Sequence, residues 1–263
     1  MNNETTAFNE LVKTIGQLRG PNGCPWDKEQ THESLKRFLV EEVYEVIEAI
    51  RSGDDEKLKE ELGDLLLQIV LQAQIATDNG SFNINDVAYG INKKMVERHP
   101  HVFKHNNSIS VDEVLTQWED LKPKSQNILG DLPKDLPALL KALKISQKAV
   151  SYGFEWENID QIWQQLFSEI DEFKAELAEF KNTKRANNSK AHKKMEMELG
   201  DILFTIVNIA RYNNIDPEEA LHLMCDKFIR RFTAMEKLAN INLKDLTIDQ
   251  WNDLWQKAKS VTG

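Results

Sequence analysis

The chain contains few cysteines, glycines and prolines, and it has no long hydrophobic run. Its two cysteines, Cys24 and Cys225, form neither a CxxC motif nor a disulfide framework, so we expect a reducing compartment. Eleven glycines and seven prolines among 263 residues disfavour a turn-rich β-sandwich or barrel. The N-terminus lacks a basic start with an apolar run, and the most apolar stretch, residues 62–76, is interrupted by polar side chains. We therefore expect no signal peptide, no membrane partner and a cytoplasmic protein.

Basic residues are also outnumbered. The chain carries 43 Asp and Glu against 33 Lys and Arg, for a formal net charge of −10. A nucleic-acid partner normally requires a basic face that displaces counterions from phosphates, so we expect none here. Hydrophobic residues make up 41% and charged residues 29%, which is typical of a folded domain with a hydrated surface.

The hydrophobic pattern predicts an all-α fold. Apolar residues recur at three and four positions, and alternating strand patterns are scarce. We predict helices near residues 5–18, 31–51, 55–78, 84–98, 111–122, 137–151, 159–181, 191–213, 217–239 and 247–259. Residues 123–137 contain three prolines and are predicted to be a linker. The domains are accordingly residues 1–122 and 138–263.

The two halves resemble each other. Residues 62–70 (LGDLLLQIV) return as residues 199–207 (LGDILFTIV), an offset of 137. The other matches keep the same order: Glu42 and Glu45 with Glu169 and Glu172, Lys94 and Arg98 with Lys227 and Arg231, and Trp118 with Trp255. A polar insertion at residues 181–190 predicts a longer hairpin loop in the second half. This pattern indicates a tandem duplication of one helical module.

Each half carries two carboxylate pairs on consecutive helices, which a short turn at residues 52–55 folds antiparallel in the first half. They are Glu42, Glu45, Glu61 and Asp64 in the first half, and Glu169, Glu172, Glu198 and Asp201 in the second. Residues three apart project from one side of a helix, so the pairs of each half can face each other. Glu42 stands in an apolar stripe, where an unpartnered carboxylate is costly. Surface ion pairs are the simpler interpretation of one pair, but their repetition favours a shared site.

An all-oxygen donor set favours a hard cation. Carboxylates without His or Cys suit Mg²⁺, with Mn²⁺ as a substitute, whereas a ferritin-like di-iron site would require Glu-x-x-His. His99 and His101 flank Pro100 and are expected to be loop residues. Mg²⁺ held by carboxylates usually keeps water and binds substrate phosphates. Without a Walker loop or an evident nucleophile, metal-assisted attack by water is the favoured chemistry.

Basic side chains that could meet phosphates follow the carboxylates. Lys227, Arg230 and Arg231 share one helix face, and Arg supplies a fork that matches phosphate oxygens. The matching residues of the first half are, in order, Lys94, Glu97 and Arg98. Because an acid opposes phosphate binding, we predict that the second half provides most of the activity.

Four further residues have both a nucleotide-binding and a structural interpretation. Lys194 could reach a phosphate or form an ordinary i,i+4 salt bridge with Glu198. Trp118 and Trp255 could stack on a base, although a lone Trp more often belongs to a core. Gln165 makes the face of the second-half helix more polar and is assigned to nucleotide binding.

Several separate motifs, taken together, resemble the MazG family. They are CPWD at residues 24–27, EExxE at 41–45, ExxD at 61–64 and RHPHVF at 98–103. The resemblance covers nearly the whole chain and implies an all-α enzyme that uses Mg²⁺ to hydrolyse nucleoside triphosphates to nucleoside monophosphate and pyrophosphate. It also implies a homodimer in which helical hairpins pair into four-helix bundles. The second half departs from the doubled glutamate, because Ser168 precedes Glu169.

The expected mechanism places catalysis in the second half. Its four carboxylates would hold Mg²⁺ and activate water for attack on the α-phosphorus, and the basic face would meet the pyrophosphate. Which carboxylate is the general base stays open. We expect a role in nucleotide-pool housekeeping. Two other classes also stay open, namely a non-catalytic nucleotide or metal sensor and a helical interaction scaffold.

Overall fold

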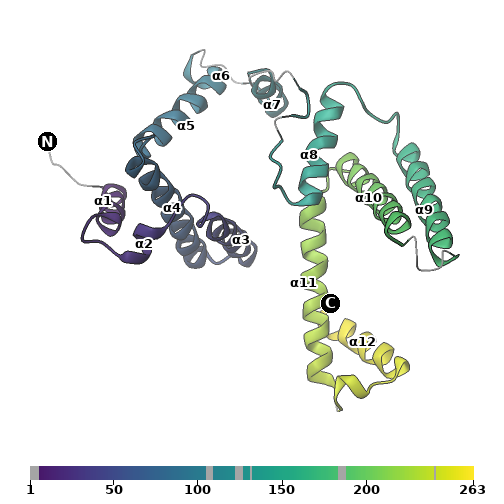
Figure 1. Cartoon of the computed structure of the whole chain (residues 1–263). Coiled ribbons are helices and arrows are strands. Elements are labelled where there is room, and N and C mark those ends of the chain that lie inside the picture. Colours follow the sequence, from purple (N-terminus) through teal and green to yellow (C-terminus); the bar gives the residue numbers. More distant parts are fainter. Residues whose placement is uncertain (1–5, 105–108, 122–126, 131, 183–187, 240) are drawn as a thin grey trace. The chain divides into compact units, whose positions relative to one another are not determined.

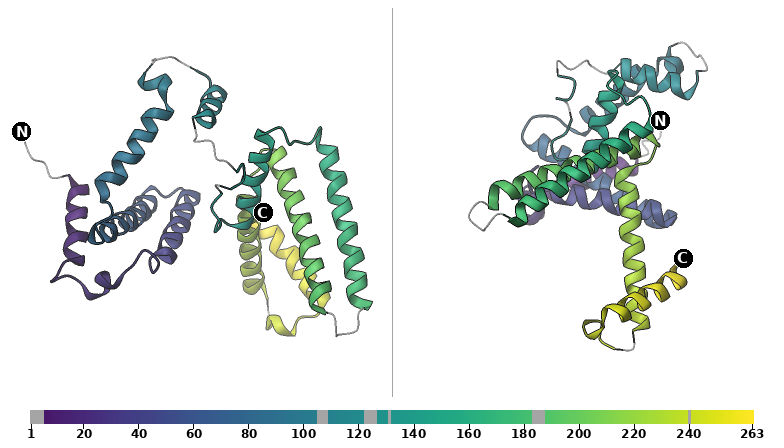
Figure 2. Two further views of the ribbon diagram at one scale, coloured as in Figure 1. Left: turned by 45° about the horizontal axis from the view of Figure 1, so that its top comes forward. Right: turned by 90° about the vertical axis from the view of Figure 1, so that its right-hand side faces the viewer.

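The computed structural model of the chain describes residues 6–104, 109–121, 127–130, 132–182, 188–239 and 241–263. These residues form helices and turns without a strand (Figures 1 and 2), so the all-α prediction is confirmed. The chain divides into two compact units, Met1–Pro123 and Lys124–Gly263. The first contains α1 (Ala7–Arg19), α2 (Pro25–Glu29), α3 (Lys36–Ser52), α4 (Asp55–Asp78), α5 (Ile84–Arg98), α6 (Pro100–Phe103) and α7 (Val111–Asp120). The second contains α8 (Ala138–Ser151), α9 (Ile159–Asn182), α10 (Asn188–Tyr212), α11 (Pro217–Leu238), the short 3₁₀ turn η1 (Leu243–Asp245) and α12 (Ile248–Thr262).

The hairpin of α3 and α4 is built by its turn. Gly53 has a φ of 67°, a left-handed conformation that glycine adopts without steric cost. The Asp54 side chain caps α4 by accepting hydrogen bonds from the backbone N–H groups of Glu56 and Lys57. The turn is therefore short enough to lay α3 directly against α4.

The core of the first unit lies where α1 crosses α4. Ile15 of α1, Leu35 and three residues of α4 form one buried cluster. Arg19 at the end of α1 binds Asp78 of α4 at 2.7 Å, and its Nη1 donates to the backbone carbonyls of Asp27 and Gln30. This arginine thereby fixes α2, whose five residues are too few for a helix that is stable alone.

The second unit repeats the plan of a shorter helix followed by a long hairpin. Helices α9 and α10 pack along their length, and α8 lies against α10. Ile162, Leu166 and Val207 are buried in this part. A separate core joins the far part of α11 to α12 through Met235 and Leu254. The hairpin and the α11–α12 pair are thus two packed parts of one unit.

A polar network ties the α8–α9 loop to α10. Arg211 of α10 donates from Nη1 and Nη2 to the two carboxylate oxygens of Glu155, at 2.6 Å each. Its Nε donates to Ser146 Oγ at 2.7 Å, and that hydroxyl donates to Asn208 at 2.6 Å. The Arg211 guanidinium lowers the pKa of Glu155 below its ordinary value. Charge-assisted, bidentate hydrogen bonds of this kind fix geometry strongly.

The structure corrects three sequence-based expectations. Residues 25–29 and 100–103 form short helices, so His101 belongs to a helical turn rather than a loop. Residues 31–35 form a turn, and α3 begins only at Lys36. The predicted polar loop at 181–190 is shorter, because α9 continues to Asn182 and α10 begins at Asn188; residues 183–187 lie outside the described residues.

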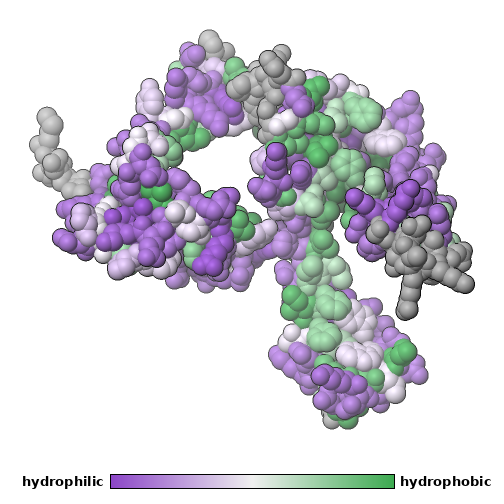
Figure 3. All heavy atoms as spheres, viewed as in Figure 1, coloured by the Kyte–Doolittle hydropathy of each residue, from purple (hydrophilic) through white to green (hydrophobic). Residues whose placement is uncertain are grey.

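Apolar side chains are exposed over several helices. Figure 3 shows hydrophobic surface along α11, where Leu221, Leu223, Met224, Phe228 and Ile229 are exposed. The hairpins expose apolar residues too, among them Leu62 of α4 and Leu199 of α10. None of the helices in the described part of the chain is both long and apolar enough to cross a membrane.

Candidate functional site

The first hairpin brings three carboxylates together, which we call the first acidic cluster. Glu42 and Glu45 of α3 and Glu61 of α4 each offer an oxygen, and these oxygens all lie within 4.8 Å of one another. Three negative charges at this separation repel strongly unless protons or a cation intervene. The cluster is therefore a place where positive charge stabilises the fold.

The pKa values of this cluster reflect partial burial first and that repulsion second. Partial burial raises the pKa of Glu42 above its ordinary value, and its neighbours Glu45 and Asp64 raise it further. Burial also raises the pKa of Glu61, with Glu45 as the next contributor. Both effects disfavour the charged carboxylates in the absence of a cation.

The second hairpin forms an equivalent group, the second acidic cluster. Its members are Glu169 of α9 with Glu198 and Asp201 of α10, whose oxygens also lie within 4.8 Å of one another. Partial burial raises the pKa of Glu198, followed by the charges of Glu172 and Asp201. Each hairpin therefore concentrates negative charge at its α–α interface.

Asp64 and Glu172, the fourth carboxylate predicted in each half, lie outside these 4.8 Å groups. Asp64 acts on Glu42 and Glu61 through its charge alone. Glu172 accepts a hydrogen bond from Ser168 Oγ at 3.2 Å. The two halves thus use different members: Glu45 in the first, and Asp201 in the second.

One buried glutamine adjoins the first cluster. Gln68 of α4 is only 6% exposed, and its Nε2 donates to Glu42 Oε1 at 3.4 Å. Its Oε1 is buried without a hydrogen-bond partner. The three carboxylates form an all-oxygen donor set without His or Cys, so the residues present fit a hard cation such as Mg²⁺. The repeat offset aligns Gln68 with Thr205, so the duplication offered no signal for it.

In the second cluster a different glutamine performs this contact. Gln165 of α9 donates from Nε2 to Glu169 Oε1 at 2.6 Å. Gln165 precedes Glu169 by one helical turn, and the matching residue of the first half is Phe38. The structure therefore gives Gln165, assigned from the sequence to nucleotide binding, a carboxylate partner.

In the described part of the chain, the basic residues predicted to meet phosphates form no ion pair with either acidic cluster. Lys194 binds Glu176 across the hairpin at 3.0 Å, rather than Glu198. Among the described residues, no hydrogen bond or ion pair joins Lys227, Arg230 or Arg231 to the second cluster. Within the described residues, the predicted cations are therefore not in contact with the carboxylates of the two clusters.

The same arginine–tryptophan contact occurs in both units. The Arg231 guanidinium lies 5.7 Å from the ring centre of Trp255, and that of Arg98 lies 5.2 Å from the ring centre of Trp118. Trp255 also packs against the α11–α12 core. Both tryptophans therefore fix an arginine side chain, a role that the lone-residue interpretations did not include.

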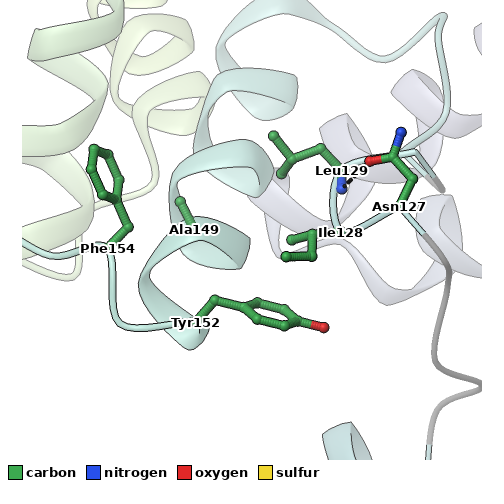
Figure 4. A pocket seen from close by; sticks show the side chains of 6 residues that line it. All are labelled: Asn127, Ile128, Leu129, Ala149, Tyr152 and Phe154. Carbon is green, nitrogen blue, oxygen red and sulfur yellow. Dashed lines mark hydrogen bonds between the residues drawn. The ribbon is translucent and has the colours of Figure 1, made fainter.

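A pocket elsewhere in the second unit has a different character. It has a volume of about 450 Å³ and is lined by Asn127, Ile128, Leu129, Ala149, Tyr152 and Phe154 (Figure 4). None of these side chains is charged. A polyphosphate requires cationic partners, so this pocket does not suit one.

Comparison with known proteins finds one matching family and several similar proteins. The family model described as the MazG nucleotide pyrophosphohydrolase domain matches residues 30–103 and 157–235, which confirms the duplication. The nucleoside triphosphate pyrophosphohydrolase/pyrophosphatase MazG of Thermotoga maritima is 41% identical over 260 residues, covering 96% of this chain and 95% of that protein. The nucleoside triphosphate pyrophosphohydrolase of Escherichia coli K12 is 36% identical over 262 residues, covering 96% and 97%. The uncharacterized protein YabN of Bacillus subtilis is 45% identical over 260 residues, covering 96% of this chain but 51% of that protein.

Proposed function

The chain belongs to the MazG family, and from this premise we propose that it hydrolyses nucleoside triphosphates, with ribose or deoxyribose, to nucleoside monophosphate and pyrophosphate. The observation that supports this most directly is the acidic cluster at each hairpin, three carboxylate oxygens within 4.8 Å of one another. Phosphates approach carboxylates only when divalent cations lie between them. The matched family and the two nearly full-length relatives carry names that agree with this reaction.

The proposed residues of the reaction lie in the second unit. Glu169, Glu172, Glu198 and Asp201 would hold Mg²⁺, which when bound polarises water and neutralises phosphate charge. One of these carboxylates accepts the proton of the attacking water as its oxygen bonds to the α-phosphorus. The bond from the α-phosphorus to the bridging oxygen then breaks, and pyrophosphate leaves.

The basic residues on the helix that follows each hairpin support the second unit as the main site. Its long helix carries Lys227, Arg230 and Arg231, whereas Glu97 occupies the middle position of the matching face in the first unit. Glu97 also pairs with Lys93 at 3.9 Å, so the matching face of the first unit carries an acid between Lys94 and Arg98. Charge neutralisation is a main contribution to phosphoryl transfer, and the second unit offers more cations for it.

We also propose that the chain works as a homodimer. Leu199, Leu203 and Ile206 lie at helical spacing on α10 and are 46%, 46% and 43% exposed, although a two-helix hairpin normally buries such a stripe. Gly200 adjoins this stripe in the helix interior with open space where a side chain would be. Glycine costs a helix about 1 kcal/mol relative to alanine, and close approach of a second hairpin would explain its use.

Pyrophosphate release tests the function. The chain should release pyrophosphate, and not orthophosphate, from a panel of NTPs and dNTPs when Mg²⁺ is present. A damaged-nucleotide arm compares the same rates for oxidised bases and so tests the proposed housekeeping role. A protein that bound nucleotide without turnover would instead be a sensor, and one that did neither would be a scaffold.

A further inference from the structure

Gln68 lies at the first acidic cluster and has no glutamine counterpart in the repeat, where Thr205 stands at its position. Its amide is almost completely buried, its Nε2 faces Glu42, and its Oε1 has no partner. Leaving a buried acceptor unpaired costs about 1–3 kcal/mol. Nε2 has Glu42 as its partner, so it is the oxygen alone that has no partner in the metal-free fold.

The orientation of the amide is set by charge. Turning it over would place Oε1 against the carboxylate oxygen of Glu42, and two oxygens without a proton between them repel each other. The N–H therefore holds Glu42, and Oε1 is left facing away from that contact. Mg²⁺ and Mn²⁺ keep several waters when carboxylates bind them, and a metal-bound water is a strong hydrogen-bond donor.

We propose that Gln68 is a positioning residue of a divalent-cation site in the first unit, holding Glu42 through Nε2 and accepting a hydrogen bond from a cation-bound water through Oε1. This inference rests on the proposed use of a divalent cation but does not depend on hydrolysis in the first unit. Outer-shell hydrogen bonds of this kind orient the ligands and tune affinity.

In the second unit, the glutamine that donates to the cluster glutamate lies on the other helix of the hairpin. There Gln165 of α9 donates to Glu169 at 2.6 Å, while Thr205 stands at the position of Gln68. In the first unit Phe38 occupies the position of Gln165. Each unit therefore has one glutamine for its inward glutamate, placed on α4 in one and on α9 in the other.

The proposed role of Gln68 can be tested on the full-length chain. Glu198→Gln and Asp201→Asn together disable the second cluster, and the free-Mn²⁺ signal in electron paramagnetic resonance then reports binding to the first. Gln68→Leu in this background should weaken Mn²⁺ binding by about tenfold or more, the range of outer-shell substitutions. Gln72→Leu is the matched control, because Gln72 lies on the same helix but pairs with His32; it should change the affinity less than about twofold.

Two further measurements separate positioning from damage to the fold. Without metal, Gln68→Leu should unfold at nearly the same temperature as the parent, because the loss of the Nε2 hydrogen bond to Glu42 is offset by removal of an unpaired buried oxygen. The double variant Phe38→Gln/Gln68→Thr transplants the arrangement of the second unit and should recover affinity to within about threefold of the parent. If Gln68→Leu lowers the unfolding temperature, the double variant replaces it as the test of positioning. Failure of the double variant to bind Mn²⁺ would then overturn the proposal.

Other results also overturn it. Unchanged Mn²⁺ affinity in Gln68→Leu, an equal loss in Gln72→Leu, or no binding in the parent background would each show that Gln68 serves no cation there. Pyrophosphate release by the unmodified chain is measured alongside. If that activity is present while Gln68→Leu has no effect, the proposed function stands and this inference alone fails.

Discussion

Replacing Arg211 with glutamine should destabilise the second unit, because this arginine is the centre of its polar network. The substitution removes two hydrogen bonds of 2.6 Å to Glu155 and one of 2.7 Å to Ser146. The side chain of Arg211 is 11% exposed and that of Glu155 is 31% exposed. Breaking a fully buried pair costs about 3–5 kcal/mol. Because Glu155 keeps part of its hydration, we expect about 2–3 kcal/mol here.

That loss converts to a measurable shift. For a unit of residues 124–263, 1 kcal/mol corresponds to roughly 3 °C in the unfolding midpoint, so Arg211→Gln should lower it by about 6–9 °C. Tryptophan fluorescence is suitable, since four of the six tryptophans lie in this unit. Arg230→Gln is the control, as Arg230 is exposed and none of the described residues forms an ion pair with it. A shift below about 2 °C, or an equal shift in the control, would refute the reasoning.

The pH dependence gives a second check on the same pair. The pKa of Glu155 is lowered from 4.5, chiefly by its hydrogen bond from Arg211. A carboxyl with a lowered folded-state pKa contributes stability that is present above its unfolded pKa and lost as the pH falls through the folded value. The difference between the wild type and Arg211→Gln should therefore be full at about pH 7 and shrink in acid. A difference that stays constant into strong acid would mean that packing, and not charge, holds the loop.

Three other predictions concern the acidic clusters and assembly. Glu198→Gln should reduce NTP hydrolysis at least about 100-fold, whereas Glu61→Gln should leave most of it; equal losses, or the reverse order, would contradict the assignment to the second unit. In chelator, Glu198→Gln should unfold at a higher temperature than wild type, and thermal melts check this. The gap should widen as the pH rises from about 4 to about 7.5, because the raised pKa of Glu198 means that the folded wild type loses stability as this group ionises. Chelator should also abolish the activity of the wild type, which Mg²⁺ should restore and Zn²⁺ should restore poorly. Light scattering should give twice the chain mass, and a monomer at working concentrations would count against the exposed apolar face of α10 as a dimer interface.

The sequence by itself determined the helices and their repetition. The three-to-four spacing of apolar residues predicted α4 at residues 55–78 and α5 at 84–98 with the bounds that the structure has. These features are local, because a helix of this length depends on its own periodicity and caps. The spacing of the carboxylates also predicted that both helices of a hairpin contribute to one cluster, since residues three apart share a face.

Only the tertiary structure decided which side chains meet. Helix α2 is fixed by Arg19 through the carbonyls of Asp27 and Gln30, a contact that no periodicity encodes. Gln68 reaches Glu42 from the neighbouring helix, and Lys194 pairs with Glu176 rather than with Glu198 one turn away. Spacing along one helix fixes a direction but not the register of a neighbouring helix. Side-chain partners across a hairpin therefore follow from how its turn sets two helices against each other.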